Sequence, residues 1–231
     1  MTSDYSKLEY WNQRYASEKH YEWCLGYSSF KLNFEREVPS KKARILILGC
    51  GNSSLGNDLS ANGYTYVLNS DYSDVLIGKM NQEYPNLKWV VADINKLEEF
   101  FSFESFDVIL EKATLDSFFV KEKDPWHYNS EILIKMNRIL SQISRILVKG
   151  GKFISLSFTQ PHFRKPIYAK PEFNWSFNYS TYGDYFHYFF YVMTKGESLD
   201  SACINASISI SHFVEPLSED EEDFIFSIQC P

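Results

Sequence analysis

The sequence lacks the features that mark membrane-spanning, secreted and zinc-binding proteins. Its longest run of apolar and aromatic residues, at 185–193, includes a histidine and is far too short to cross a bilayer. The N-terminus, MTSDYSKLEY, has no apolar stretch of the kind found in signal peptides. The 4 cysteines form no CxxC pair and have no zinc-like spacing to histidine, which favours free thiols in a reducing compartment. We therefore expect a cytoplasmic protein with no metal site and no membrane partner.

Two phosphate-binding motifs are also missing. The dinucleotide motif GxGxxG is broken because the third glycine comes late, at Gly56, and no GxxxxGK[ST] sequence is present. A net charge of -7 and a pI near 5.3 argue against extensive nucleic-acid binding. The chain is 44% hydrophobic, with no internal repeat and no long linker, so residues 1–231 are expected to form one folded domain.

What the sequence does contain is a buried-strand pattern followed by a glycine turn, ILILGCGNSS at 45–54. Four branched apolar residues in a row are typical of a strand that is buried on both faces. Gly49 and Gly51 then allow a tight turn in which the backbone can approach a ligand closely. Ser54 is a candidate N-cap for the helix that follows, so the stretch has the form of a nucleotide-type site. An ordinary strand-to-helix turn would look the same.

Strand-like and helix-like segments alternate after this turn. We expect strands at 64–70, 87–91, 106–110 and 152–159, one helix after Ser73, and a second at 131–148 that Gly150 and Gly151 end. This order is typical of a doubly wound, Rossmann-like α/β fold with a mostly parallel sheet. Aromatic sequence at 173–194 predicts an antiparallel hairpin added at the sheet edge. Residues 215–231, with the acidic run SEDEED, are expected to be a solvated C-terminal tail.

Two aspartates fall at expected carboxyl ends of strands, where open α/β sheets bind their ligands. Asp71 lies 22 residues after Gly49, the spacing at which a carboxylate commonly holds a ribose diol. Asp93 lies another 22 residues on, where it could accept a hydrogen bond from an adenine amino group. Either aspartate alone would more often be a helix cap or a loop residue. Together, and without a phosphate motif, they favour S-adenosylmethionine, an adenosine ligand that bears no phosphate.

Residues 1–30 are rich in aromatic side chains. Trp11, Arg14 and Tyr15 are spaced i, i+3 and i+4, which places them on one face of a helix. That face could pack on the core of the protein. It could equally cover a ligand as a lid, since aromatic rings suit a purine or a sulfonium cation.

Several short stretches carry a more specific resemblance. They are LGCGNSSL, Asp71-Tyr72-Ser73, FDVILEKATLD, Asp124-Pro125-Trp126, the N-terminal EYWNQRY, GKFISLSF and PHFR at 161–164. The chain resembles the class I S-adenosylmethionine-dependent methyltransferases, and among them the methyltransferase-like proteins that modify lysines of translation elongation factor 1-alpha. The similarity covers nearly the whole chain apart from the last thirty or so residues. Ile47 and Ser53 depart from the acidic residue and the third glycine that the class usually carries.

The resemblance implies a site as well as a fold. It implies cofactor contacts from Trp11, Tyr15, Trp23, Gly49, Asp71, Tyr72, Asp93, Ile94 and Lys112. The family's EKGTLD motif, which is tied to activity, corresponds to 111–116, with Ala113 in place of the glycine. The expected reaction is methylation of a protein lysine, with elongation factor 1-alpha as the expected partner.

Methyl transfer from a sulfonium requires a neutral amine aligned with the methyl group, and it requires no metal. Glu111 and Asp116 are our candidates to orient the lysine, although Asp116 could instead cap a following helix. A small-molecule methyltransferase would share every cofactor feature, and a catalytically silent binding module would share the fold. An NAD-linked oxidoreductase fits less well because its phosphate motif is absent.

Overall fold

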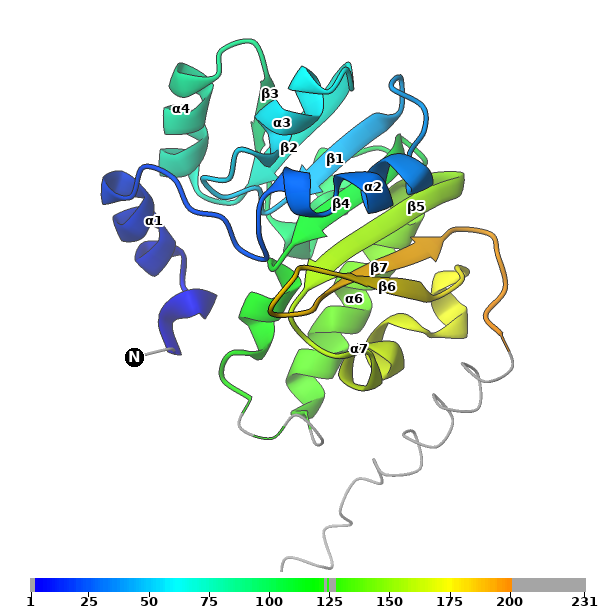
Figure 1. The fold of residues 1–231 in the computed structure, drawn as a ribbon. Helices are drawn as coiled ribbons and strands as arrows, with labels where there is room; N and C mark the ends of the chain where they lie inside the picture. The colour runs from blue at the N-terminus through cyan, green and yellow to red at the C-terminus, as the bar shows by residue number, and fades with distance from the viewer. Residues whose placement is uncertain (1–2, 123, 125–127, 201–231) are drawn as a thin grey trace, which may run out of the picture.

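A seven-stranded sheet with the order β3-β2-β1-β4-β5-β7-β6 forms the centre of the protein. The computed structural model describes residues 3–122, 124 and 128–200, and these are the residues meant below. Neighbouring strands are parallel from β3 through to β5, whereas β7 is antiparallel to both β5 and β6. The predicted fold and the edge hairpin are therefore confirmed (Figure 1). The strands are β1 Arg44–Leu48, β2 Tyr66–Asp71, β3 Lys88–Val91, β4 Phe106–Lys112, β5 Leu147–Ser157, β6 Asn178–Tyr182 and β7 Tyr188–Thr194.

Helices cover both faces of this sheet (Figure 1). The α-helices are α1 Leu8–Ser17, α2 Lys31–Glu37, α3 Leu55–Ala61, α4 Asp74–Glu83, α5 Leu97–Phe100, α6 Ser130–Ile146 and α7 Pro161–Tyr168. Short 3-10 helices are η1 Ser3–Ser6, η2 Tyr27–Ser29, η3 Ile94–Lys96, η4 Leu115–Phe119 and η5 Pro171–Phe173.

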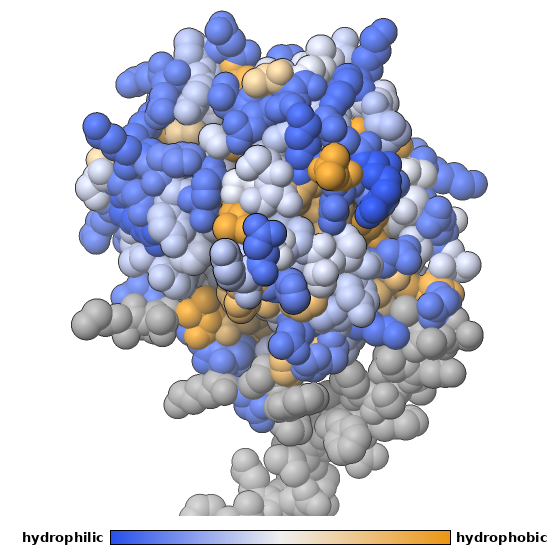
Figure 2. Space-filling view, in the orientation of Figure 1, coloured by the Kyte–Doolittle hydropathy of each residue, from blue (hydrophilic) through white to orange (hydrophobic). Residues whose placement is uncertain are grey.

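The alternation of side chains along β1 separates the core into two layers. Leu46 and Leu48 belong to the cluster that contains the apolar residues of α6 and α7. Ile45 and Ile47 belong to the cluster built with α2 and α3. Because successive residues of a strand point to opposite faces, four consecutive apolar residues are what a strand between two helix layers requires. The surface seen in the same orientation is mainly hydrophilic, with small separate hydrophobic patches (Figure 2).

One local prediction is wrong, and a second is confirmed only in its position. Helix α6 ends at Ile146, and the glycine pair lies inside β5 instead of ending the helix. Gly150 has a φ of 78°, and a Cβ at Gly151 would lie 2.8 Å from a backbone oxygen, so both glycines serve an irregularity in the β4–β5 pairing. Ser54 does occupy the N-cap position of α3, but its hydroxyl donates to Asp58 (2.6 Å) and accepts no capping hydrogen bond from the helix. The predicted cap at Ser73 is confirmed, since its hydroxyl accepts from the Leu76 N–H (3.1 Å).

The N-terminal segment, residues 3–30, lies beside the carboxyl end of the sheet, with α1 next to α4 (Figure 1). Tyr15 is buried against Leu76 and Met80 of α4, in a small cluster separate from the two main layers. No helix in the described part of the chain is long and apolar enough to cross a membrane. The predicted acidic tail at 215–231 and Pro125-Trp126 of the sequence resemblance lie outside the described residues.

Candidate active site

A pocket lies at the carboxyl ends of β1, β2 and β4, beneath the N-terminal segment. All ten residues that we assigned to the cofactor line it: Trp11, Tyr15, Trp23, Gly49, Gly51, Asp71, Tyr72, Asp93, Ile94 and Lys112. Sequence reasoning missed several other lining residues: Tyr5, Ser6, Tyr21, Cys50, Asn52, Ser53, Asn95, Thr114, Ser117, Phe118, Lys135 and Phe158. Asp116 also lines the pocket, whereas Glu111 does not. The fold therefore gathers these ten residues around one cavity from five separate parts of the chain: the N-terminal segment, the glycine turn and the ends of β2, β3 and β4.

The glycine turn forms one wall of the pocket. Gly49 and Gly51 have φ values of 59° and 54°, a left-handed conformation that glycine adopts without strain. A Cβ at Gly49 would overlap the side chain of Thr114, whose hydroxyl donates to the Leu48 and Gly49 carbonyls (3.0 and 3.1 Å). Gly49 is therefore required by the backbone conformation and by the close approach of the loop that follows β4.

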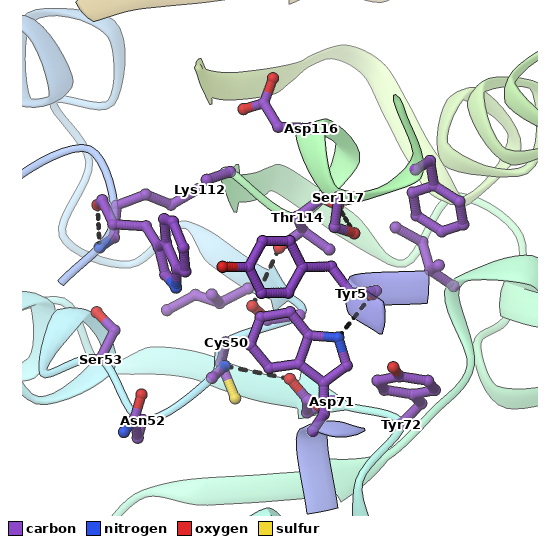
Figure 3. A pocket seen from close by; sticks show the side chains of 18 of the residues that line it. Tyr5, Cys50, Asn52, Ser53, Asp71, Tyr72, Lys112, Thr114, Asp116 and Ser117 are labelled. Carbon is purple, nitrogen blue, oxygen red and sulfur yellow. Dashed lines mark hydrogen bonds between the residues drawn. The ribbon is translucent and has the colours of Figure 1, made fainter. Parts of the chain in front are cut away.

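Asp71 lies at the base of this turn. Its carboxylate accepts from the backbone N–H of Gly51 (3.2 Å) and of Ser73 (3.0 Å), and Figure 3 shows it beside the turn. Burial raises the pKa of Asp71 to about 6, although hydrogen bonds from the backbone N–H groups of Ser73, Gly51 and Tyr72 oppose that rise. A carboxylate has acceptor sites left beyond these, so Asp71 can still take a hydroxyl pair of a ligand.

Asp93 both caps a helix and lines the pocket, so the two roles that we weighed for it are compatible. Its Oδ1 accepts from the backbone N–H (2.9 Å) and the side-chain amide (2.7 Å) of Asn95 at the start of η3. The cap fixes the side chain at the strand end, where its remaining oxygen is a candidate acceptor for an adenine amino group.

Stacked aromatic rings from the N-terminal segment form the opposite wall. Tyr5 stacks on Trp11 at 5.5 Å, and Trp11 stacks on Tyr15 at 5.5 Å between ring centroids. The indole N–H of Trp11 donates to the Tyr5 carbonyl (2.7 Å), which fixes the order of the stack. Arg14 lies over the rings of Trp11 and Trp23, at 5.6 and 5.4 Å from their centroids. Tyr15 thus packs on α4 and also faces the pocket, so these contacts are compatible with both interpretations of the segment.

Glu22, which we did not predict, fastens the N-terminal segment over the site. Its carboxylate accepts from Lys112 (2.5 Å), from the Ser53 hydroxyl (2.8 Å) and from the Ser54 N–H (2.7 Å). Burial alone would raise the pKa of Glu22, but the charge and hydrogen bond of Lys112 outweigh it and lower the pKa below its usual value. Lys112 also donates to the Trp23 carbonyl (2.7 Å), so its ammonium group holds the N-terminal segment.

Glu111 and Asp116 are the first and last residues of the motif at 111–116, but their side chains have different surroundings. Glu111 is fully buried on the face of β4 opposite to Lys112, and it accepts from the N–H groups of Thr114 (2.9 Å) and Leu115 (3.1 Å) and from the Ser155 hydroxyl. The position facing an incoming amine that we expected for Glu111 is therefore not what the structure shows. Its carboxylate instead holds the loop after β4 in shape.

Asp116 remains at the pocket. It does not cap a helix, as the alternative supposed; its Oδ1 accepts from the hydroxyls of Ser157 (2.7 Å) and Thr159 (2.9 Å) and from Arg164. Figure 3 shows Asp116 and Asp71 on opposite sides of the Tyr5 ring. The pocket thus has one carboxylate at the glycine turn and another at its far end.

The mostly parallel sheet with antiparallel β7 between β5 and β6, together with the glycine turn and the strand-end carboxylates, is the arrangement of the class I methyltransferase fold. Residues 39–193 match the model of a family described as methyltransferase domain. The chain is 39% identical to EEF1A lysine methyltransferase 4 of Mus musculus, over 97% of this chain and 92% of the relative. The Bos taurus protein of the same name is 38% identical over the same shares. In fold, the chain is similar to the N-methyltransferase NodS of Bradyrhizobium japonicum, solved with S-adenosyl-L-homocysteine (TM-score 0.55, 15% identity, 82% of this chain and 98% of that chain).

The chain belongs to the EEF1A lysine methyltransferase 4 family of S-adenosylmethionine-dependent protein-lysine methyltransferases. The residues of the pocket fit that cofactor. Asp71 and Asp93 offer carboxylate oxygens, the stacked rings offer flat apolar surface, and the ammonium of Lys112 is already engaged by Glu22. A phosphate group would instead require free backbone N–H groups at the turn, but those of Gly51 and Ser54 already donate to the carboxylates of Asp71 (3.2 Å) and Glu22 (2.7 Å).

Proposed function

We propose that this methyltransferase modifies a lysine of translation elongation factor 1-alpha in the cytoplasm, where translation takes place. The observation that carries the proposal is the division of the pocket into two ends, with Asp71 at the cofactor turn and Asp116 at the far end. The two mammalian relatives are named for the same substrate, and their similarity extends over 97% of the chain.

The surroundings of the pocket favour a protein substrate over a small molecule. Tyr21 and Phe158 line the pocket and are still 41% and 45% exposed. The β6–β7 hairpin reaches the same region, because the Tyr182 hydroxyl donates to the Cys24 carbonyl (2.8 Å), next to Trp23. At its tip, Tyr185 and Phe186 are exposed. Exposed aromatic side chains beside a binding site are typical of protein interaction surfaces.

The chain's own residues then have three tasks. Bound S-adenosylmethionine supplies an activated methyl group, so the protein has to place a neutral amine in line with it. At pH 7 roughly one free lysine in a few thousand is neutral, given an ordinary pKa near 10.4. We assign Asp116 to accept a hydrogen bond from the lysine nitrogen and orient it, while a departing proton passes to water. Residues 3–30, as the lid, keep bulk water from the cofactor end.

The proposal predicts that Asp116→Asn lowers methyl transfer and spares cofactor affinity. One lost positioning interaction costs about 2–4 kcal/mol in the barrier, which is roughly 30- to 1000-fold in rate. Purified elongation factor 1-alpha, labelled methyl donor and single-turnover conditions would measure the rate, and calorimetry with S-adenosylhomocysteine would measure affinity.

Asp107→Asn is the matched control, since Asp107 lies on β4 and pairs with Arg44 (2.8 Å), outside the residues that line the pocket. Label appearing only in small molecules of an extract would favour the small-molecule alternative. Cofactor binding without transfer to any acceptor would favour the silent module. Asp116→Asn transferring at the parental rate would remove Asp116 from the mechanism.

A further inference from the structure

Arg164 of α7 is a buried charge that the reaction, as described so far, does not use. The residue is 1% exposed, and its Nη2 donates to Asp116. Among the described residues, its Nε and Nη1 have no hydrogen-bond partner. The guanidinium instead lies over the rings of Phe119 (4.6 Å) and Tyr168 (5.7 Å). A fully buried arginine with a single hydrogen bond is held there mainly by the carboxylate that it faces.

The two oxygens of the Asp116 carboxylate differ in their hydrogen bonds. Oδ1 accepts all three donors, from Ser157, Thr159 and Arg164. Oδ2 is buried and has no hydrogen-bond partner in the described part of the chain. Three donors on one oxygen fix the plane of the carboxylate, and they leave the other oxygen as an unused acceptor in a residue that lines the pocket.

Stability alone does not account for this pair. A buried ion pair is seldom more stable than apolar residues of the same volume, because removing two charges from water costs more than their attraction returns. A second carboxyl group, Glu111 of β4, also lies near the pair. The other titratable groups that face it are neutral: Tyr168 from α7, Tyr182 from β6, Tyr191 from β7, Cys24 and Tyr128. Burial and the charge of Asp116 raise the pKa of Glu111 to about 7, and Arg164 opposes that rise.

We propose that Arg164 is a positioning residue, which keeps Asp116 ionised and oriented so that its free oxygen can receive the nitrogen of the substrate lysine. This inference rests on the proposed function, since it gives Asp116 a substrate to orient. Burial disfavours the charged form of a carboxylate, and the guanidinium of Arg164, which donates to Oδ1, offsets that cost. A protonated Asp116 would no longer stabilise the lysine nitrogen.

The test is Arg164→Met measured across pH. Near pH 7 we expect methyl transfer to fall at least about 30-fold, with the affinity for S-adenosylhomocysteine unchanged. The ratio of variant to parental rate should rise about tenfold or more between pH 7 and 9, as Asp116 of the variant regains its charge. Taking the ratio removes the rise with pH that both proteins share as the substrate lysine deprotonates. Arg164→Lys should recover part of the rate and give a ratio that does not change with pH.

Arg145→Met is the matched control, because that arginine pairs with Glu98 (2.7 Å) on the exposed side of α6 and should alter neither rate nor ratio. If Arg164→Met does not fold, Arg164→Gln carries the same test. A rate ratio that is low but constant with pH would show that Arg164 supports only the fold, and it would overturn the proposal. So would a parental rate in Arg164→Met.

A second readout does not depend on activity. In the complex with S-adenosylhomocysteine, the 13Cγ signal of Asp116, identified by its loss in Asp116→Asn, should titrate at higher pH in Arg164→Met than in the parent. Equal titration midpoints would overturn the inference. A parental enzyme that fails to methylate elongation factor 1-alpha would refute the proposed function, whereas this titration would still report whether Arg164 holds the charge of Asp116.

Discussion

Replacing Glu111 by glutamine should change how the stability of the protein depends on pH. Glu111 is 0% exposed, and burial, with a further contribution from Asp116, raises its pKa from 4.5 to about 7. In the unfolded chain the group loses its proton near its ordinary value. Between these two pH values the folded state holds a proton that the unfolded state has lost, so the free energy of unfolding falls as the pH rises through the window. The contribution is fully lost above about pH 7.

The size of this effect follows from the two pKa values. Each pKa unit corresponds to about 1.4 kcal/mol, so the folded protein gives up about 3 kcal/mol between pH 4.5 and pH 7. Glutamine keeps an acceptor for the N–H groups of Thr114 and Leu115 but has no proton to lose. The free energy of unfolding of Glu111→Gln, minus that of the parent, should therefore increase by about 3 kcal/mol across this window.

Urea unfolding of the cofactor-free proteins at pH 5, 6, 7 and 8 would measure that difference. Asp71 also titrates in this range, with a pKa of about 6. Because it does so in both proteins, its contribution cancels in the difference between their free energies of unfolding. Glu98→Gln on the exposed side of α5 is the control and should run parallel to the parent. If the free energy of unfolding of Glu111→Gln also changes with pH in parallel with that of the parent, the reasoning is refuted.

The same variant should transfer methyl groups at close to the parental rate, since Glu111 holds a loop and does not line the pocket.

Two further predictions concern the cofactor. Asp71→Ala should remove charge-assisted hydrogen bonds worth about 1.5–3 kcal/mol and weaken S-adenosylmethionine binding roughly ten- to a hundredfold, while the protein stays folded. Calorimetry that finds unchanged affinity would contradict the assignment of Asp71 to the ribose. Deleting residues 1–18 should weaken binding strongly yet cost the apo protein only about 1.5–3 kcal/mol, the burial of Tyr15, because that ring packs outside the two main core layers. A collapse of the apo melting temperature would show instead that this segment builds the core.

Much of the fold could be predicted because its signals are local. The apolar run at 45–48, the glycine turn and the N-cap at Ser73 each act within a few residues. The boundary between α6 and β5 could not, because Gly150 and Gly151 resemble a helix stop and only the β4–β5 pairing shows that they accommodate an irregular strand. Local sequence does not contain that partner strand.

In the site, too, the features with local sequence signals could be predicted and those that depend on distant partners could not. The resemblance supplied residues at the glycine turn and the strand ends, where position along the sheet sets their place. It gave no role to Glu22, nor to Arg164 in the PHFR stretch, because their partners Lys112 and Asp116 lie 90 and 48 positions away. Alternation along β4 does place Glu111 and Lys112 on opposite faces, but it does not say which face borders the pocket. Sequence reasoning therefore places Glu111 at the substrate, whereas in the structure its side chain faces Ser155 and Tyr168.

The ion pair of Glu22 with Lys112, and its hydrogen bonds to Ser53 and Ser54, also bear on how the pocket opens between catalytic cycles. Any movement that lifts the segment carrying Tyr5, Trp11 and Tyr15 away from the pocket has to separate Lys112, whose side chain is 5% exposed, from the carboxylate of Glu22. Breaking a buried ion pair costs free energy until water replaces the lost partner. Opening of the segment therefore has an energy cost of its own, which is separate from the cost of methyl transfer.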